Sequence, residues 1–338
     1  MTIAFVSLAA FIASYALTGW LARHLRQRQI VDRPNPRSSH STPTPRGGGL
    51  SLVASITGGI AVLSAAGTVS MPLAAVLILG GLSIAAIGFW DDIRLAPVAI
   101  RMTVHFGAAV LAVYVLGALS GIRVGNSVVQ LGSAGFVLGV LAVVWILNLF
   151  NFMDGIDGIA ASEAAFAFFG SAGIVLFAAH GTPADAAPAL LAGAACCGFL
   201  RWNWPPAAIF MGDVGSGYLG YVIAIIALAS LQTSELSLFT WLILGGVFFV
   251  DATLTLSRRV LRGKPVYQAH RTHAYQWLAR RWGSHARVTT AVIAVNLLWL
   301  LPCAVLTVKF PGSAWWLCIV ALAPLVLCAV LSGSGRPE

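Results

Sequence analysis

The sequence predicts an all-α membrane protein with about eleven transmembrane helices. Of its 338 residues, 59% are hydrophobic and only 9% are charged, whereas roughly 25% of residues in a soluble domain are charged. The apolar runs approach the ~20 residues that a helix needs to cross a bilayer. Since a spanning backbone must satisfy its own hydrogen bonds, such runs indicate helices rather than a barrel. We expect a single integral-membrane domain over 1–338.

Eleven apolar segments qualify as membrane spans, namely 3–22, 48–67, 71–90, 102–119, 134–152, 159–179, 187–201, 215–231, 237–256, 288–308 and 314–332. No basic residue precedes the first segment and an arginine cluster follows it, which is the reverse of a signal peptide. We therefore expect a retained first helix whose N-terminus lies outside. After eleven spans, the C-terminus then lies in the cytoplasm.

Positive charge is concentrated on one side of the predicted membrane. All of the 20 Lys and Arg residues except Arg123 and Lys309 fall in or beside the predicted cytoplasmic segments. The positive-inside rule predicts this asymmetry, so the net charge of +9 requires no nucleic-acid partner. Those segments are 23–47, 91–101, 153–158, 202–214 and 257–287, together with the tail after 332.

The most informative stretch is 148–158, which reads NLFNFMDGIDG. Asn151, Asp154 and Asp157 recur every three residues, and Asn151 and Asp154 share a face if the preceding helix continues that far. A carboxylate at the bilayer centre costs about 2.5–3.5 kcal/mol on insertion scales, which favours a functional role. Oxygen ligands of this kind suit a hard cation such as Mg²⁺. The alternative is an ordinary cytoplasmic turn between two helices.

Carboxylates also occur in two other predicted cytoplasmic segments. Asp91 and Asp92 are adjacent at a helix end, where such a pair binds a cation or has one raised pKa that suits proton transfer. A salt-bridged cap with Arg94 is the alternative. Asp213 lies between glycines just before a helix start, where N–H groups point toward the loop, and an ordinary N-cap is the alternative. We expect these groups to meet at one cytoplasmic surface.

The first cytoplasmic loop contains the stretch RSSHSTPTPRGGG over 37–49. Arg37 and His40 are suited to holding a lipid headgroup. The three glycines either let backbone N–H groups contact a phosphate at a helix N-terminus or allow tight packing of the following helix.

The longest cytoplasmic loop carries His270 and His273 among many arginines. Residues 272–282 are expected to form an amphipathic surface helix. Such a loop can bind anionic headgroups or a nucleotide diphosphate. Two histidines three residues apart indicate zinc only weakly, since no further ligands are nearby.

Together, these blocks resemble the polyprenyl-phosphate N-acetylhexosaminyl-1-phosphate transferases, glycosyltransferase family 4. The family includes enzymes that initiate O-antigen, common-antigen and teichoic-acid synthesis, and the phospho-N-acetylmuramoyl-pentapeptide transferase. The resemblance covers most of the chain. It rests on R-x-x-H-x-x-P-x-P-x-G-G from Arg37, the pair Asp91–Asp92, N-x-x-D-G-x-D-G from Asn151, F-M-G-D-x-G-S from Phe210, and His270-x-x-His273.

The resemblance also implies roles for individual residues. Asn151 and Asp213 match the Mg²⁺ ligands of the family, with Mn²⁺ able to substitute. Asp91 and Asp92 match its catalytic or phosphate-orienting carboxylates. Residues expected to bind the nucleotide-sugar or the lipid phosphate are Asp154, Asp157, Arg37, His40, Asn203, His270 and His273. Where family members often have three clustered histidines, this sequence has only two.

The implied reaction moves N-acetylhexosamine-1-phosphate from a UDP-sugar to undecaprenyl phosphate and releases UMP. It would initiate O-antigen or another cell-surface polysaccharide at the bacterial inner membrane, with the site facing the cytoplasm. The sugar is open among GlcNAc, GalNAc and 6-deoxy sugars, and a homodimer is compatible with this expectation. Membrane lipids are the other expected partners, and no nucleic acid is expected.

Other functions fit the residues less well. The peptidoglycan-type pentapeptide transferase is the nearest alternative, and its denser histidine cluster is absent here. A proton-coupled transporter would place its carboxylates near the bilayer midplane. A CDP-alcohol phosphotransferase requires an Arg where Ser162 stands, and a prenyltransferase requires a second carboxylate one turn after Asp91–Asp92. A scaffold without activity would leave the carboxylates unexplained.

Overall fold

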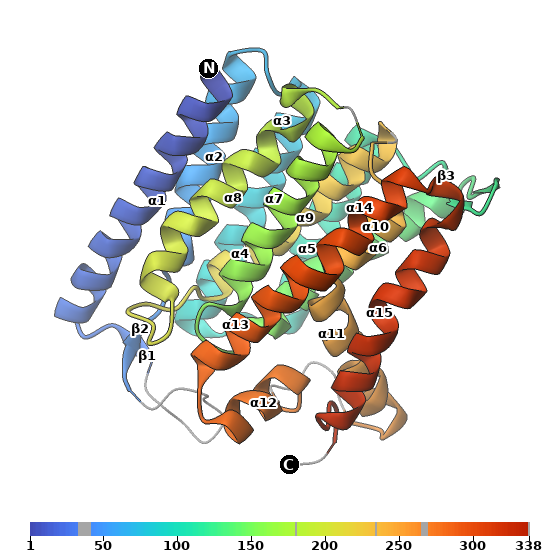
Figure 1. Cartoon of the computed structure of the whole chain (residues 1–338). Coiled ribbons are helices and arrows are strands. Elements are labelled where there is room, and N and C mark those ends of the chain that lie inside the picture. Colours follow the sequence, from blue (N-terminus) through green and yellow to red (C-terminus); the bar gives the residue numbers. More distant parts are fainter. Residues whose placement is uncertain (33–41, 180, 234, 265–269, 337–338) are drawn as a thin grey trace.

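The computed structural model describes residues 1–32, 42–179, 181–233, 235–264 and 270–336. They form a helical bundle with the N- and C-termini at opposite ends (Figure 1). The helices are α1 (Thr2–Gln27), α2 (Gly49–Ala65), α3 (Met71–Ala75), α4 (Gly81–Arg94), α5 (Val98–Leu116), α6 (Ala134–Met153), α7 (Ile159–Phe177), α8 (Pro183–Asn203), α9 (Asp213–Gln232), α10 (Leu238–Leu244), α11 (Gly246–Leu261), α12 (Ala274–Trp282), α13 (His285–Val295), α14 (Leu301–Lys309) and α15 (Ala314–Leu331).

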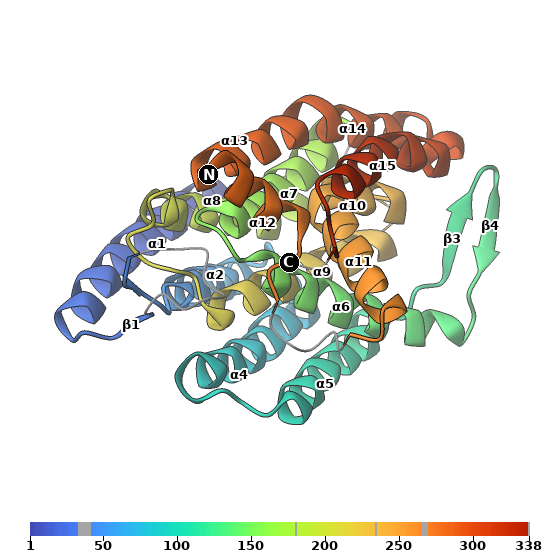
Figure 2. The ribbon, with the colours of Figure 1, turned by 90° about the horizontal axis from the view of Figure 1, so that it is seen from below.

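Shorter elements join these helices. Two π-helical segments, η1 (Val76–Gly80) and η2 (Asn296–Leu300), continue into α4 and α14, and a 3₁₀ turn, η3 (Pro311–Ser313), precedes α15. The strands pair antiparallel as β1 (Val31–Asp32) with β2 (Thr44–Pro45), and β3 (Gly121–Val124) with β4 (Ser127–Gln130). The second pair is a hairpin that projects from the bundle (Figure 2).

The structure confirms the prediction of an all-α polytopic membrane protein. Within the described ranges, nine helices are long and apolar enough to span a membrane, and the pair α10 and α11, bent by 84°, makes up to ten. The predicted second span corresponds to α2, which has only 17 residues. The predicted amphipathic helix in the longest loop is α12.

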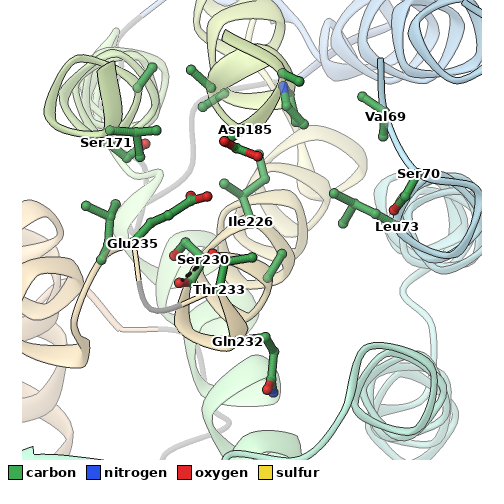
Figure 3. A pocket seen from close by; sticks show the side chains of 18 of the residues that line it. Val69, Ser70, Leu73, Ser171, Asp185, Ile226, Ser230, Gln232, Thr233 and Glu235 are labelled. Atoms are coloured by element: carbon green, nitrogen blue, oxygen red, sulfur yellow. Dashed lines mark hydrogen bonds between the residues drawn. The ribbon is translucent and has the colours of Figure 1, made fainter. Parts of the chain in front are cut away.

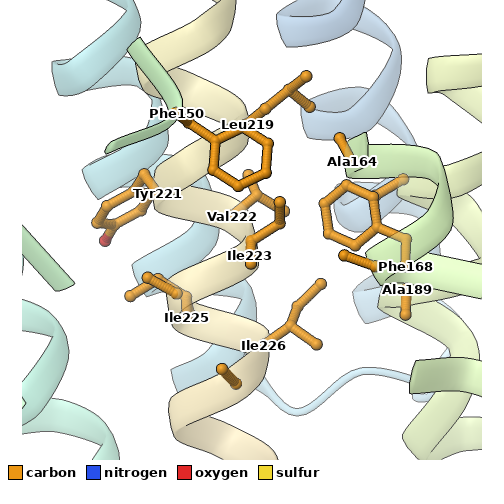
Figure 4. Packing of buried hydrophobic residues seen from close by; sticks show 14 of the residues in the cluster. Phe150, Ala164, Phe168, Ala189, Leu219, Tyr221, Val222, Ile223, Ile225 and Ile226 are labelled. Atoms are coloured by element: carbon orange, nitrogen blue, oxygen red, sulfur yellow. The ribbon is translucent and has the colours of Figure 1, made fainter. Parts of the chain in front are cut away.

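Helix α9 forms the centre of the bundle. Buried residues cover all of its faces, and α4 and α6 lie beside it when the bundle is seen from the end that carries α12 (Figure 2). Its side chains interlock with Phe150 of α6, Phe168 of α7 and Ala189 of α8 (Figure 4). Because the start of α9 carries Asp213, this packing fixes the position of that carboxylate.

Glycines allow neighbouring helices to approach the start of α9 closely. A Cβ on Gly49 of α2 would lie 2.3 Å from the Cα of Gly215, and one on Gly88 of α4 would lie 2.5 Å from the carbonyl oxygen of Asp213. Small residues at helix contacts commonly permit such close packing in membranes. Of the two interpretations of the first glycine stretch, tight packing is therefore supported.

Two helix ends determine how the predicted site residues are presented. Helix α4 continues to Arg94, beyond the predicted span 71–90, so Asp91 and Asp92 lie in its last turn, at a helix end as predicted. It ends where Leu95 adopts a left-handed conformation, shortly before Pro97. Helix α6 ends at Met153, so Asn151 and Asp154 do not share a helical face.

Candidate functional site

A polar cavity of about 220 Å³ lies at the end of the bundle that carries α12. The residues that line it come from segments far apart in the sequence, including the β1 region, the 154–157 turn, α9 and α12. Five of the predicted site residues are among them: Asn151, Asp154, Asp157, Asn203 and Asp213. The structure thus brings these five residues together at one end of the bundle.

Asp213 lies in a network of charges at the start of α9. Its Oδ1 is 2.7 Å from Nη2 of Arg46, and its Oδ2 is 3.8 Å from Nη1 of Arg101. Nε of Arg46 is 2.8 Å from Oδ1 of Asp92. Burial lowers the pKa of Arg46, but the carboxylates of Asp213 and Asp92 outweigh burial, so the pKa is raised.

Asp92 supplies the cap of α9. Its side chain is 6% exposed and accepts hydrogen bonds from the backbone N–H groups of Asp213, at 2.9 Å, and Val214, at 3.1 Å. Gly212 makes room for this contact, because a Cβ there would lie 2.5 Å from Oδ2 of Asp92 and its φ is +77°. Asp92 therefore links the end of α4 to the start of α9.

Asp91 contacts the same network from its other side. Its Oδ2 pairs closely with Nη1 of Arg101, the guanidinium that also approaches Asp213. Its Oδ1 accepts the N–H of Ala96 at 2.7 Å. Asp91 and Asp92 are not among the residues that line the cavity in the described part of the chain. Asp91 is nevertheless connected to it, because Asp91 and Asp213 both contact Arg101.

The residues around Asp213 are chemically suited to a hard cation. Nδ2 of Asn151 donates to Oγ of Ser216 at 3.1 Å, which leaves the amide oxygen as an available ligand. Burial, and then the negative charge of Asp213, raise the pKa of Asp154 to about 7, so the site gains from an added positive charge. Within the described segments, no cluster of three His, Cys, Asp or Glu residues could hold a metal. Mg²⁺, however, commonly uses one or two carboxylates plus waters and substrate phosphates. The set Asn151, Asp154 and Asp213 fits that pattern.

Asp157 and Asn203 also line the cavity. Oδ2 of Asp157 accepts the N–H of Ala207 at 3.1 Å, and its Oδ1 is 3.4 Å from Nδ1 of His285. Asn203 is buried. Its Oδ1 accepts the N–H of Gly158 at 3.1 Å while its Nδ2 donates to the carbonyl of Ile209 at 2.9 Å. Asn203 thus ties the turn before α7 to the loop before α9.

The loop histidines lie apart from the cavity lining as it is described. The His270 and His273 rings stack at 5.0 Å, and His273 is buried. Burial, and then the neighbouring His273, lower the pKa of His270 to about 3, so His270 is neutral at physiological pH. The other two predicted substrate-binding residues, Arg37 and His40, lie outside the described residues.

Several cavity residues were not predicted as site residues, among them Arg46, Gln276 and His285. Arg46 directly precedes the first glycine stretch, and its backbone bridges to Phe210, so its place between two motifs was the available signal. Gln276 lies three residues after His273 on α12. His285 begins α13 after a Ser N-cap, and no sequence pattern marks it.

Two N–H groups of the first glycine stretch already have backbone partners. Gly48 donates to the carbonyl of Phe210 and Gly49 to that of Met211, both at 2.9 Å. These bonds join the first loop to the loop that precedes Asp213, which brings Arg46 to the site.

A second cavity of about 300 Å³ (Figure 3) lies beside α3, at the end of the bundle opposite α12 (Figure 1). Asp185 and Glu235 face it, together with Ser230 and Thr233. Asp185 caps α8 by accepting the N–H of Thr182 at 2.8 Å. None of the predicted site residues that the structure describes lines this cavity.

Comparison with known proteins gives consistent results. The glycosyl transferase family 4 model matches residues 74–231. A Bacillus subtilis protein described as a probable undecaprenyl-phosphate N-acetylglucosaminyl 1-phosphate transferase is 27% identical, over 88% of this chain and 82% of its own. A decaprenyl-phosphate N-acetylglucosaminephosphotransferase of Mycobacterium tuberculosis is 30% identical, over 88% and 80%. A phospho-N-acetylmuramoyl-pentapeptide-transferase of Heliobacterium modesticaldum is 32% identical, over 75% and 82%.

Proposed function

The chain belongs to glycosyl transferase family 4, and on that premise we propose that it is a polyprenyl-phosphate sugar-1-phosphate transferase. It transfers an N-acetylhexosamine-1-phosphate from a UDP-sugar to undecaprenyl phosphate and releases UMP. The observation that carries this proposal is the single cavity in which Asn151, Asp154, Asp157, Asn203 and Asp213 meet. Two relatives that this chain covers over at least four fifths of their length are described as transferases of this type.

The position of the cavity suits a reaction between a soluble and a lipid-embedded substrate. Arg123 and Lys309 lie at the opposite end of the bundle, whereas the other described Lys and Arg residues lie in or beside segments at the cavity end. By the positive-inside rule, this supports a bacterial inner-membrane protein whose cavity faces the cytoplasm. A proton-coupled transporter is not favoured, because its carboxylates would lie near the midplane.

In the proposed reaction, a phosphate oxygen of the polyprenyl phosphate attacks the sugar-linked phosphorus. The bond from that phosphorus to the bridging oxygen breaks, and UMP leaves with the electron pair. Because the second pKa of a phosphate monoester is ~6, the nucleophile is mostly ionised at pH 7 and needs little base catalysis. We therefore propose one-step displacement in which positioning contributes most.

The network at the start of α9 supplies that positioning. We propose Asp213 and Asn151, with Asp154 beside them, as the ligands of a Mg²⁺ ion, which would neutralise the diphosphate and stabilise charge on departing UMP. Asp92 holds the N-terminus of α9 and Arg46, and so fixes the carboxylate of Asp213. Asp91, which shares Arg101 with Asp213, keeps the predicted catalytic role.

The proposal is tested by measuring UMP release from purified protein in detergent micelles. We expect UMP to form from a UDP-N-acetylhexosamine only when undecaprenyl phosphate and Mg²⁺ are both present. A panel of UDP-GlcNAc, UDP-GalNAc and 6-deoxy sugars would identify the donor, and UDP-N-acetylmuramoyl-pentapeptide tests the peptidoglycan-type alternative. Failure of every donor to yield UMP would refute the proposal. Labelled phosphate trapped on Asp91 or Asp92 would refute one-step displacement.

A further inference from the structure

The proposed mechanism makes no use of Asp251, a buried carboxylate of α11 with 4% of its surface exposed. Its Oδ1 accepts the N–H of Ala274 at 2.8 Å, and its Oδ2 accepts the N–H of Tyr275 at 3.1 Å. These are the first two residues of α12. A buried carboxylate is stable only when it is paired and hydrogen-bonded. The partially positive N-terminus of α12 meets both needs.

Three further side chains surround the same carboxylate. Nδ1 of His273 lies 3.5 Å from Oδ1 of Asp251. The hydroxyl of Thr255 donates to Oδ1 at 3.0 Å, and that of Ser334 at 3.3 Å. Ser334 belongs to the segment after α15, and the next residue, Gly335, donates its N–H to the carbonyl of Thr272 at 2.8 Å. The C-terminal segment thus helps to hold the start of α12 against α11.

The first turn of α12 is also its contact with the candidate site. The hydroxyl of Tyr275 donates to the carbonyl of Phe152 at 3.2 Å, next to Asn151. Gly155 lets Tyr275 come this close, because a Cβ there would lie 2.1 Å from that hydroxyl oxygen. Gln276 follows directly and lines the cavity.

We propose that Asp251 is a positioning residue for the proposed transfer reaction, and that it acts by holding α12 so that Gln276 contacts the nucleotide-sugar. His273 belongs to this clamp rather than to the substrate site. The inference rests on the proposed function, but the placement of α12 by Asp251 can be measured without catalysis.

The kinetic test compares Asp251→Asn, Gln276→Ala and the double variant. Asn keeps one acceptor oxygen, so the two N–H groups of α12 lose their shared carboxylate. An N-cap loss of ordinary size corresponds to roughly a three- to tenfold effect. We expect KM for the UDP-sugar to rise by that factor while kcat changes little. In the double variant the two effects should not multiply, because Asp251 acts through Gln276. Fully multiplicative effects would mean that Asp251 supports only the fold.

Hydrogen–deuterium exchange separates the proposed role of Asp251 from the proposed transfer reaction, because it needs no catalysis. Hydrogen–deuterium exchange of peptides covering 272–278 should speed up in Asp251→Asn, while peptides from α7 stay protected. The matched control is Thr253→Val on the same helix, since the Thr253 hydroxyl has no hydrogen-bond partner among the described residues. It should leave both readouts unchanged. If wild-type protein released no UMP, the proposed function would fall, and exchange would still decide whether Asp251 holds α12. Unchanged exchange in Asp251→Asn would overturn the inference.

Discussion

Replacing Asp92 tests whether this carboxylate positions Asp213 or acts as a general base. Asp92 accepts hydrogen bonds from the backbone N–H groups of Asp213 and Val214, and its Oδ1 forms an ion pair with Nε of Arg46 at 2.8 Å. Asp92→Asn keeps the shape and one acceptor oxygen but loses the charge. Asp92→Ala removes all three contacts, and Arg46 then keeps Asp213 but loses Asp92 as a carboxylate partner.

The expected magnitudes follow from these contacts. Loss of a helix cap costs about 0.5–2 kcal/mol, and a hydrogen bond to a charged group contributes about 1.5–3 kcal/mol. Asp92→Ala should therefore lower the free energy of unfolding by roughly 2–5 kcal/mol, and Asp92→Asn by less than half of that. Activity should fall only through the displacement of Asp213, by about tenfold for Asn, whereas loss of a general base costs about 10²–10⁴-fold.

The assay pairs the midpoint of thermal unfolding in detergent with the rate of UMP release. Asp185→Asn is the matched control, because Asp185 is also a helix-capping carboxylate but lies at the other end of the bundle. It should reduce stability and leave UMP release unchanged. A loss of more than a hundredfold in Asp92→Asn with an unaltered midpoint would refute the positioning role and identify Asp92 as catalytic.

Three further predictions follow from the site and its packing. Asp213→Asn should reduce UMP release by at least about a hundredfold in saturating Mg²⁺, since even residues that only orient a metal ligand contribute about 10–100-fold. Near-normal activity would contradict the role of Asp213 as a Mg²⁺ ligand. EDTA should abolish UMP release, and Mg²⁺ or Mn²⁺ should restore it; activity that persists in EDTA would remove the metal from the proposal. Gly88→Ala should lower the unfolding midpoint because the added Cβ would lie 2.5 Å from the carbonyl oxygen of Asp213. Gly58→Ala is the control and should leave the midpoint unchanged, because no atom lies within 4 Å of the added Cβ. Equal midpoints for the two variants would show that α4 can move away from α9.

The sequence could predict the helices and the end of the bundle at which the site lies, because both depend on composition. Apolar length sets the spans, and the distribution of Lys and Arg orients them. Once it is known which connecting segments lie on each side of the membrane, Asn151, Asp154 and Asp213 must lie at the same end of the bundle. Helix ends were harder to predict. The predicted span 71–90 continues as α4 through Arg94 because the break comes only at Leu95, which adopts a left-handed conformation.

The roles within the site depended on contacts that sequence spacing does not determine. His270 and His273 were expected to bind substrate, but His273 comes directly before the first residue of α12 and faces Asp251, 22 positions earlier in the sequence. The direction of its side chain is therefore set by a carboxylate on another helix. Gln276, in the first turn of α12, faces the cavity instead, because the capped N-terminus and the Tyr275 contact orient that turn. A histidine in such a loop is thus weak grounds for a ligand until the partner of its ring is known, and here that partner makes it part of the clamp on α12.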